Sequence, residues 1–209
     1  MAYARGADRI WIVNVGDLKP VEIPISHFLD MAYDAETWDV DSTSDWATAW
    51  AAREFGPDLA ANVSSLMVHY GTMANRRKFE LIEPQSYSVI NYNEGEALLE
   101  EWAALQSQAE AVYDALDESA QPAFFQMVLH PVIGGNIVNQ IYIESAKNML
   151  YAGQKRNSAN PKMMEVFKLS DADSELTDRW DEMLDGKWAH MMDREYICVE
   201  SLGDQDDAD

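Results

Sequence analysis

The hydrophobic positions of the chain follow a helical period over most of its length. Between Asn93 and Leu116, apolar side chains recur every three or four residues and so mark one face of a helix. Asn93 followed by Glu96 is a typical N-cap pattern for that helix. A second helix is expected to begin at Asn160–Pro161, because proline is well tolerated at the first helical position. A third is expected over residues 174–185, ending at Gly186.

Two further segments complete the helical pattern. Residues 45–78 predict a helix that is interrupted near Gly56-Pro57, and residues 124–151 are apolar around much of the helical circumference. Pro131 and the Gly134-Gly135 pair predict a kink or break in the second of these segments. Four or five helices joined by short links favour an antiparallel bundle, and therefore a mainly α fold class.

One short segment predicts a strand instead. Residues 10–13, Ile-Trp-Ile-Val, form a β-rich apolar run without polar alternation, which is typical of a strand buried on both faces. Such a strand needs neighbours on both sides, and the remaining sequence predicts none. The run therefore indicates that the chain is a piece of a larger protein.

The end of this predicted strand is the best candidate for a binding site. Asn14, Asp17 and Lys19 follow the strand, and Gly16 between them allows a ligand to approach closely. Polar groups at the carboxyl ends of strands form the active sites of α/β barrels and open sheets. The alternative is an ordinary turn, in which the asparagine and the aspartate satisfy local backbone amides.

Charge excludes some classes of partner. The chain carries 15 Lys and Arg against 37 Asp and Glu, a formal net charge of -22. This surplus argues against binding duplex nucleic acid and against docking on an anionic membrane. Hydrophobic residues make up 47% of the 209 residues, which is ordinary for a globular protein. The segment after Gly203 is acidic, and we expect it to be disordered.

Cofactor and metal motifs are not evident in the sequence. A single cysteine, Cys198, cannot form an intrachain disulfide or a cysteine-based zinc site. The sequence contains no glycine-rich phosphate loop and no serine nucleophile elbow. The histidines lack the spacing of paired metal ligands, which favours single hydrogen-bonded roles on helices; they are His27, His69, His130 and His190. We therefore expect no cofactor and no metal.

Two smaller patterns have both functional and structural interpretations. The basic cluster Arg76-Arg77-Lys78 could bind the carboxylate of a sugar, but pairing with nearby carboxylates at a helix C-terminus is the favoured interpretation. Asn62-Val63-Ser64 fits the glycosylation pattern, which alone is weak evidence.

Six segments carry a resemblance to a known family. They occur in collinear order, and they are residues 6–20, 28–34, 76–80, 87–94, 130–132 and 187–193. The first, Gly-Ala-Asp-Arg-Ile-Trp-Ile-Val-Asn-Val-Gly-Asp-Leu-Lys-Pro, resembles a signature stretch of glycoside hydrolase family 115, the xylan α-1,2-glucuronidases.

The resemblance implies an internal fragment of a larger enzyme. Residues 1–44 would be the C-terminal remnant of a TIM-type catalytic barrel, residues 45–193 a helical bundle domain, and residues 194–209 a divergent tail. The acid and base carboxylates would lie upstream of Met1, so the chain alone is expected to be inactive. The parent would remove (4-O-methyl-)glucuronic acid from glucuronoxylan or xylo-oligosaccharides with inversion, and Asn14 would bind the sugar. Asp17 and Lys19 share the same motif.

The compartment and assembly of the parent follow from the resemblance as expectations. The chain begins without the apolar region of a secretory signal, whereas the parent is expected to be secreted. A homodimer of the parent is possible. The alternative interpretation of the whole chain is a free-standing acidic helical module that binds a partner and has no catalytic activity.

Overall fold

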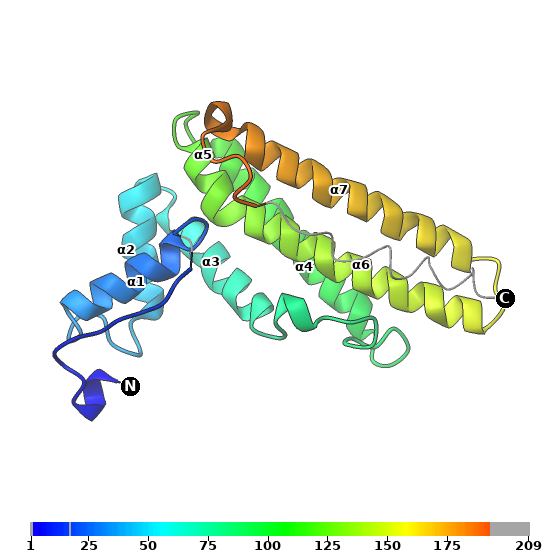
Figure 1. The fold of residues 1–209 in the computed structure, drawn as a ribbon, viewed down its shortest axis with the longest axis horizontal. Helices are drawn as coiled ribbons and strands as arrows, with labels where there is room; N and C mark the ends of the chain where they lie inside the picture. The colour runs from blue at the N-terminus through cyan, green and yellow to red at the C-terminus, as the bar shows by residue number, and fades with distance from the viewer. Residues whose placement is uncertain (1, 17, 193–209) are drawn as a thin grey trace. The chain divides into compact units, whose positions relative to one another are not determined.

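The structure is a computed structural model that describes residues 2–16 and 18–192, and it is mainly helical (Figure 1). No strand occurs among these residues. The helical elements are η1 (Tyr3–Arg5), α1 (Glu22–Tyr33), α2 (Thr43–Phe55), α3 (Ala60–Ala74), η2 (Phe79–Leu81), α4 (Glu94–Ala115), α5 (Gln121–Phe124), the π-helical turn η3 (Phe125–Leu129), α6 (His130–Gly153) and α7 (Ala159–Gly186).

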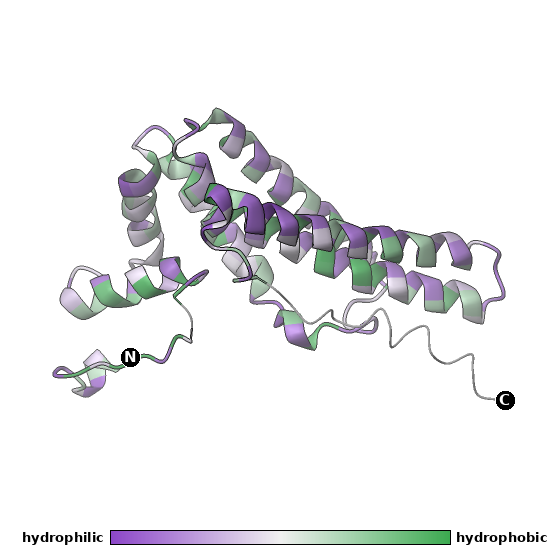
Figure 2. Cartoon of the chain, turned by 45° about the horizontal axis from the view of Figure 1, so that its top comes forward, coloured by the Kyte–Doolittle hydropathy of each residue, from purple (hydrophilic) through white to green (hydrophobic). Residues whose placement is uncertain are grey.

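The chain divides into two compact units. Unit 1 comprises Met1–Met73 and Ser107–Pro131, and unit 2 comprises Ala74–Gln106 and Val132–Asp209. Each long helix carries hydrophobic and hydrophilic residues along its whole length (Figure 2), as expected for helices with one buried face. Within the described part of the chain, every helix is too short or too polar to cross a membrane.

Aromatic side chains form the core of unit 1. Trp46 and Trp50 of α2 stack with their ring centroids 6.3 Å apart, and Trp50 meets Phe55 edge to face at 5.6 Å. Phe55 in turn contacts Phe124 of α5 at 5.4 Å, and Phe124 lies 6.4 Å from Tyr113. This row of rings connects α2 with the end of α4 and with α5, which are far apart in the sequence. It is a large apolar core for a small unit.

The N-terminal part of unit 1 contributes no fully buried residue to that core, although His27 and Asp30 of α1 contact Trp46. Among the described residues that precede Trp46, none is buried, and this includes all twelve residues of α1. Several of these residues are large and apolar, and Ile10 and Ile12 are 79% and 90% exposed. A helix in water is normally stabilised by burying its apolar face, and α1 buries none completely.

Close helix packing organises unit 2. A β-carbon built on Gly135 of α6 would lie 2.6 Å from Cη2 of Trp102, a fully buried side chain on α4. The same carbon would lie 3.2 Å from Cζ of Phe79. Glycine therefore lets the backbone of α6 approach the indole ring directly. Further along unit 2, Trp180 of α7 is buried and donates a hydrogen bond from Nε1 to the carbonyl oxygen of Trp188 at 3.1 Å.

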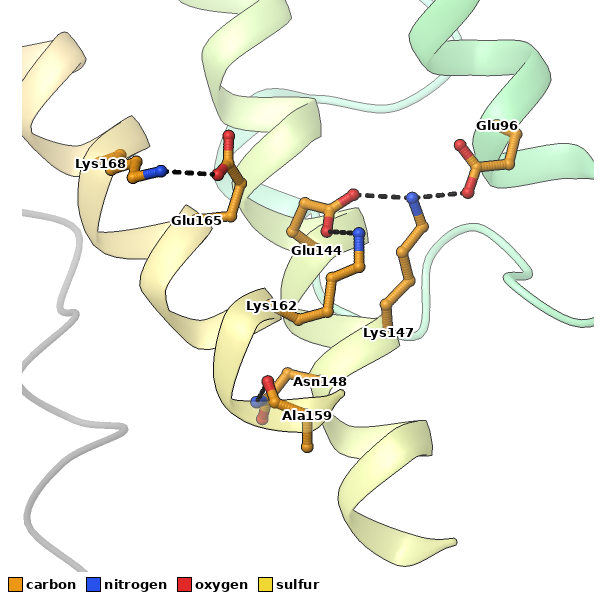
Figure 3. A network of polar contacts seen from close by, with 8 residues as sticks. All are labelled: Glu96, Glu144, Lys147, Asn148, Ala159, Lys162, Glu165 and Lys168. Carbon is orange, nitrogen blue, oxygen red and sulfur yellow. Dashed lines mark hydrogen bonds and ion pairs between the residues drawn. The ribbon is translucent and has the colours of Figure 1, made fainter. Parts of the chain in front are cut away.

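A network of charges connects α4, α6 and α7 within unit 2 (Figure 3). Lys147 of α6 lies 2.7 Å from Glu144 of the same helix and 2.5 Å from Glu96 of α4. Lys162 of α7 approaches the second oxygen of Glu144 at 2.7 Å. The side chains of Lys147 and Glu144 are only 8% and 10% exposed. Buried charges of this kind are tolerated because each has opposite charges as neighbours.

The pKa values in this network follow from its pairing. Burial raises the pKa of Glu144, but hydrogen bonds from Lys147 and Lys162 outweigh burial, so its pKa lies below the ordinary value. Burial lowers the pKa of Lys147, but hydrogen bonds to Glu144 and Glu96 outweigh it and raise the pKa. Both groups are therefore charged in the folded unit at neutral pH.

The N-terminus of α4 is fixed by a compact loop in unit 2. The Ser88 hydroxyl accepts hydrogen bonds from the amides of Ile90 and Asn91, at 3.2 and 2.9 Å. The Ser88 amide donates to a carboxylate oxygen of Glu94 at 2.8 Å, and its carbonyl accepts from Gly95 at 2.9 Å. The two residues just before the helix, Tyr92 and Asn93, both have left-handed backbone conformations. The carbonyl oxygen of Asn93 accepts from the Ala97 amide at 3.0 Å, so Asn93 holds the N-cap position that the sequence predicts.

The predicted helices agree with the structure in most places. The interruption near Gly56-Pro57 separates α2 from α3, and α4 covers the expected range to within a residue at each end. The two helices expected after residue 160 are one helix, α7, whose backbone is non-helical only at Met183–Asp185. The irregularity predicted for α6 appears earlier, as the π-helical turn η3, and α6 continues unbroken past its glycine pair.

Candidate functional site

The segment predicted as a strand is not a strand in the structure. Residues 10–13 belong to no regular element. Trp11 is half-buried, with its ring centroid 5.9 Å from Phe28 of α1, while Ile10 and Ile12 face away and are exposed. The physical reason is the absence of a partner among the described residues, because a strand forms only when neighbouring backbone groups complete its hydrogen bonds.

The three predicted site residues have different surroundings. Asn14 is exposed, and Lys19 is half-buried. Asp17 lies outside the described residues. Neither of the two cavities described below is lined by Asn14 or Lys19. The structure thus places Asn14 on an exposed part of the surface.

Lys19 belongs to a closed group of three polar side chains in unit 1, which we call the Lys19 ring. Its Nζ lies 2.6 Å from Oε1 of Glu22 and donates a hydrogen bond to Oε1 of Gln126 at 2.9 Å. The amide Nε2 of Gln126 donates to the same Glu22 oxygen. Gln126 lies in the π-helical turn η3 and is 5% exposed. The second oxygen of Glu22 is buried and has no hydrogen-bond partner among the described residues.

Sequence reasoning did not identify Glu22 or Gln126. A signal was present for Gln126, because it is the only polar residue in the run Phe124–Leu129 and a buried amide must find partners. The sequence could not show which partners these are, since Lys19 and Glu22 lie more than a hundred positions away.

The four histidines lie apart, in α1, in α3, at the start of α6 and after α7. His27 stacks on Trp46 with the ring centroids 4.3 Å apart, and its Nε2 is buried without a hydrogen-bond partner among the described residues. Burial lowers the pKa of His27, and the nearby Asp30 carboxylate opposes this only in part. Across the described residues, no group of three His, Cys, Asp or Glu side chains is arranged to hold a metal ion.

The basic cluster lies just after α3 and is largely occupied by local contacts. Arg76 pairs with Glu101 at 2.7 Å, and Lys78 lies 3.6 Å from Glu80. Arg77 donates through Nε to the carbonyl oxygen of Leu81. Burial raises the pKa of the neighbouring Tyr87, and the two arginines oppose this. These contacts support the interpretation that the cluster pairs with local carboxylates.

Two cavities lie in unit 1. One, of about 330 Å³, follows α3 and α4, and its polar lining residues are Asn62, Ser65 and Gln108. The other, of about 410 Å³, lies between the N-terminal segment and α1, and its aromatic lining residues are Tyr3, Trp11, Phe28 and Tyr33. In the glycosylation pattern, Asn62 is exposed, whereas Ser64 is buried with its hydroxyl 2.9 Å from that of Thr48.

Taken together, the fold is that of a mainly helical protein whose N-terminal segment lacks a covering surface. The model of glycosyl hydrolase family 115 matches residues 1–81, which include Asn14 and Lys19. Among curated proteins, none matches the sequence.

One solved structure extends the likeness beyond residue 81. It is a family 115 4-O-methyl-α-glucuronidase with specificity for decorated arabinogalactans, 26% identical, with a TM-score of 0.69. The likeness covers 92% of this chain and 26% of that enzyme, so the chain spans about a quarter of the length of the protein it matches. Both findings support the family that the sequence resembles.

Proposed function

We propose that this chain is part of a family 115 α-glucuronidase, whose parent releases (4-O-methyl-)glucuronic acid from a decorated polysaccharide. In the parent, a carboxylic acid protonates the leaving oxygen while a carboxylate activates water, with inversion at the sugar. These two groups lie outside the chain. Asn14 hydrogen-bonds the uronic acid and orients it, and Asp17 and Lys19 belong to the same sequence motif. The parent is secreted.

The observation that carries the proposal is the lack of fully buried residues in the described N-terminal segment. No described residue before Trp46 is buried, although this region contains a β-rich apolar run and a helix with several large apolar residues. Exposed large apolar side chains that lie close together in the sequence, such as Ile10, Ile12 and Val13, are typical of a site of contact with other polypeptide. The family match over residues 1–81 covers the same region. We therefore assign residues 1–44 to the end of a catalytic barrel, residues 45–193 to an antiparallel bundle and residues 194–209 to a divergent tail.

The polysaccharide that carries the glucuronic acid is a separate part of the proposal. The motif resemblance favours glucuronoxylan, whereas the similar solved enzyme acts on decorated arabinogalactans. Both substrates present a terminal glucuronic acid. We propose glucuronoxylan, and a side-by-side assay on the two polymers tests that choice.

The first experiment extends the reading frame by sequencing transcripts that contain it. We expect upstream codons for barrel strands that carry carboxylates, and the extended protein should release 4-O-methylglucuronic acid from glucuronoxylan. The 209-residue chain should release none, because orientation of a sugar without an acid and a base gives only part of the rate enhancement. Release by the short chain, or an extended frame without such strands, would contradict the proposal.

The second experiment tests Asn14 in the extended protein. Asn14→Ala should lower kcat/KM by about 10- to 100-fold, because each lost hydrogen bond to a bound polar group costs about 1–3 kcal/mol. Asn62→Ala, an exposed asparagine on α3, is the matched control and should leave kcat/KM within about twofold. Equal effects of the two substitutions would remove Asn14 from the binding site.

A further inference from the structure

The Lys19 ring has properties that packing alone does not explain. Its three members bond to one another in every pair, so the position of each is fixed by the other two. Such mutual bonding restricts the Lys19 ammonium to one place, since its long side chain otherwise has many rotamers. The ring also draws together the start of α1 and the turn η3, two segments of unit 1 that are distant in the sequence.

Gln126 is the member whose burial requires a reason. An apolar side chain of similar length would fill the same space without any polar cost. The oxygen of the Gln126 amide instead accepts a hydrogen bond from Lys19, and one of its N–H groups donates to Glu22. It also stands in a π-helical turn, a rare element that occurs often at functional sites.

The ring is not arranged for maximum stability. The second oxygen of Glu22 is buried without a hydrogen-bond partner among the described residues, which costs free energy. A ring that holds a cation in place at some cost to stability is typical of a site that sets geometry. Lys19 follows Asn14 by only five positions in the sequence, so an anchored Lys19 shortens the free length of chain on which Asn14 can move.

We propose that Gln126 is a positioning residue, which holds Lys19 through the Lys19 ring and thereby fixes the run that presents Asn14. This inference rests on the proposed function, because the run is taken to bind the uronic acid. Gln126 lies beyond the family match, which covers residues 1–81. The proposal gives it a role in holding a segment that lies inside that match.

The test uses the 209-residue chain and two independent readouts. Backbone order parameters for Val15 and Leu18 report whether the run is held, and a titration with glucuronic acid, followed at the Asn14 side-chain amide, reports binding. In the wild-type chain we expect order parameters near 0.85, the value of a rigid backbone, for both amides. Gln126→Met removes both hydrogen bonds at similar volume, and should lower these values towards 0.6 and weaken glucuronic acid binding about tenfold.

A double substitution provides the rescue. Glu22→Gln combined with Gln126→Glu exchanges the carboxylate and the amide, so the ammonium again has one charged and one neutral acceptor. It should restore the order parameters and bring binding to within about threefold of wild type. Gln126→Glu alone places two carboxylates beside each other, and it should restore neither the order parameters nor glucuronic acid binding. Should Gln126→Met fail to fold, the comparison of Gln126→Glu with the double variant gives the same test.

Asn136→Leu is the matched control. Asn136 is also a buried amide near the start of α6, but it bonds Gln106 in unit 2 at 2.7 Å. Its loss should lower stability without changing Val15 and Leu18. Unchanged order parameters in Gln126→Met, or no rescue by the double variant, would overturn the positioning role. If wild type shows no glucuronic acid binding while order and rescue behave as expected, the sugar site fails and the positioning role stands.

Discussion

The N-terminal segment of unit 1 and the helices of unit 2 cover their apolar side chains to very different extents. In unit 2, the long helices bury complete side chains such as Trp102, Ile143 and Trp180, and even their charged residues find partners inside. In the N-terminal segment, apolar side chains are as frequent but no described residue before Trp46 is buried. The difference shows that unit 2 has a core of fully buried side chains, whereas the described residues before Trp46 contribute none that is fully buried.

A substitution in the charge network of unit 2 should lower the free energy of unfolding more than the glycine, histidine and isoleucine substitutions considered below. Glu144→Leu leaves Lys147 and Lys162 without their shared acceptor, and Lys147 is almost fully buried. We expect the free energy of unfolding to fall by about 3 kcal/mol, the lower end of the cost of removing one partner of a buried pair, because Lys147 keeps Glu96 as a partner. Urea denaturation followed by circular dichroism measures this. The exposed pair Lys168–Glu165 is the control, and Lys168→Met should change stability by less than about 0.5 kcal/mol.

Replacing glycines of α6 by alanine should have a smaller effect on the free energy of unfolding. The sign of that effect depends on the position of the glycine. Gly135→Ala places a methyl group against the Trp102 ring and should cost about 1–3 kcal/mol. Gly153→Ala, at the end of the same helix, meets no atom within 4 Å and should stabilise the chain by about 0.4–1 kcal/mol. Thermal unfolding of the two variants separates them. Equal shifts would mean that α6 does not approach the indole ring as described.

A pH titration distinguishes the two units in another way. The pKa of His27 is below its ordinary value of 6.5, so the unfolded chain takes up a proton at a pH where the folded unit 1 does not. Stability that is present above pH 6.5 should therefore decrease as the pH falls towards the folded pKa. Hydrogen exchange resolved by mass spectrometry should show this in α1 and α2. His27→Phe, which keeps a ring against Trp46, should flatten the dependence.

The smallest change in stability is expected in the N-terminal segment itself. Ile10→Lys combined with Ile12→Lys should change the free energy of unfolding by less than about 0.5 kcal/mol, because both side chains are exposed. The same pair should reduce the binding of a hydrophobic dye. Val63→Lys, a substitution at a buried position of α3, is the contrast and should unfold unit 1. A large loss of stability from the isoleucine pair would show that the segment has a buried partner within the chain.

The sequence predicted local features well and distant contacts poorly. The break at Gly56-Pro57 and the extent of α4 follow from nearby residues, and both were correct. The strand at residues 10–13 was wrong for the chain as it stands, because strand formation depends on neighbours that its own residues cannot supply. For the candidate site, Asn14 and Lys19 could be selected from their order in one run. The Lys19 ring could not be predicted, because its third member, Gln126, comes from η3, which is 107 positions away from Lys19 in the sequence.

The loop before α4 determines the rotational setting of that helix. Ser88 holds both the loop and the first residues of the helix, so the start of α4 cannot slide along the chain. A residue inserted between Asn91 and Tyr92 would be taken up outside the helix. One inserted just after Gly95 would turn everything beyond it by about 100°. Such a turn would carry Glu96 away from Lys147 and put a neighbouring residue in the place of Trp102 at Gly135, so a one-residue insertion is tolerated in the loop before Tyr92 and not in the helix after Gly95.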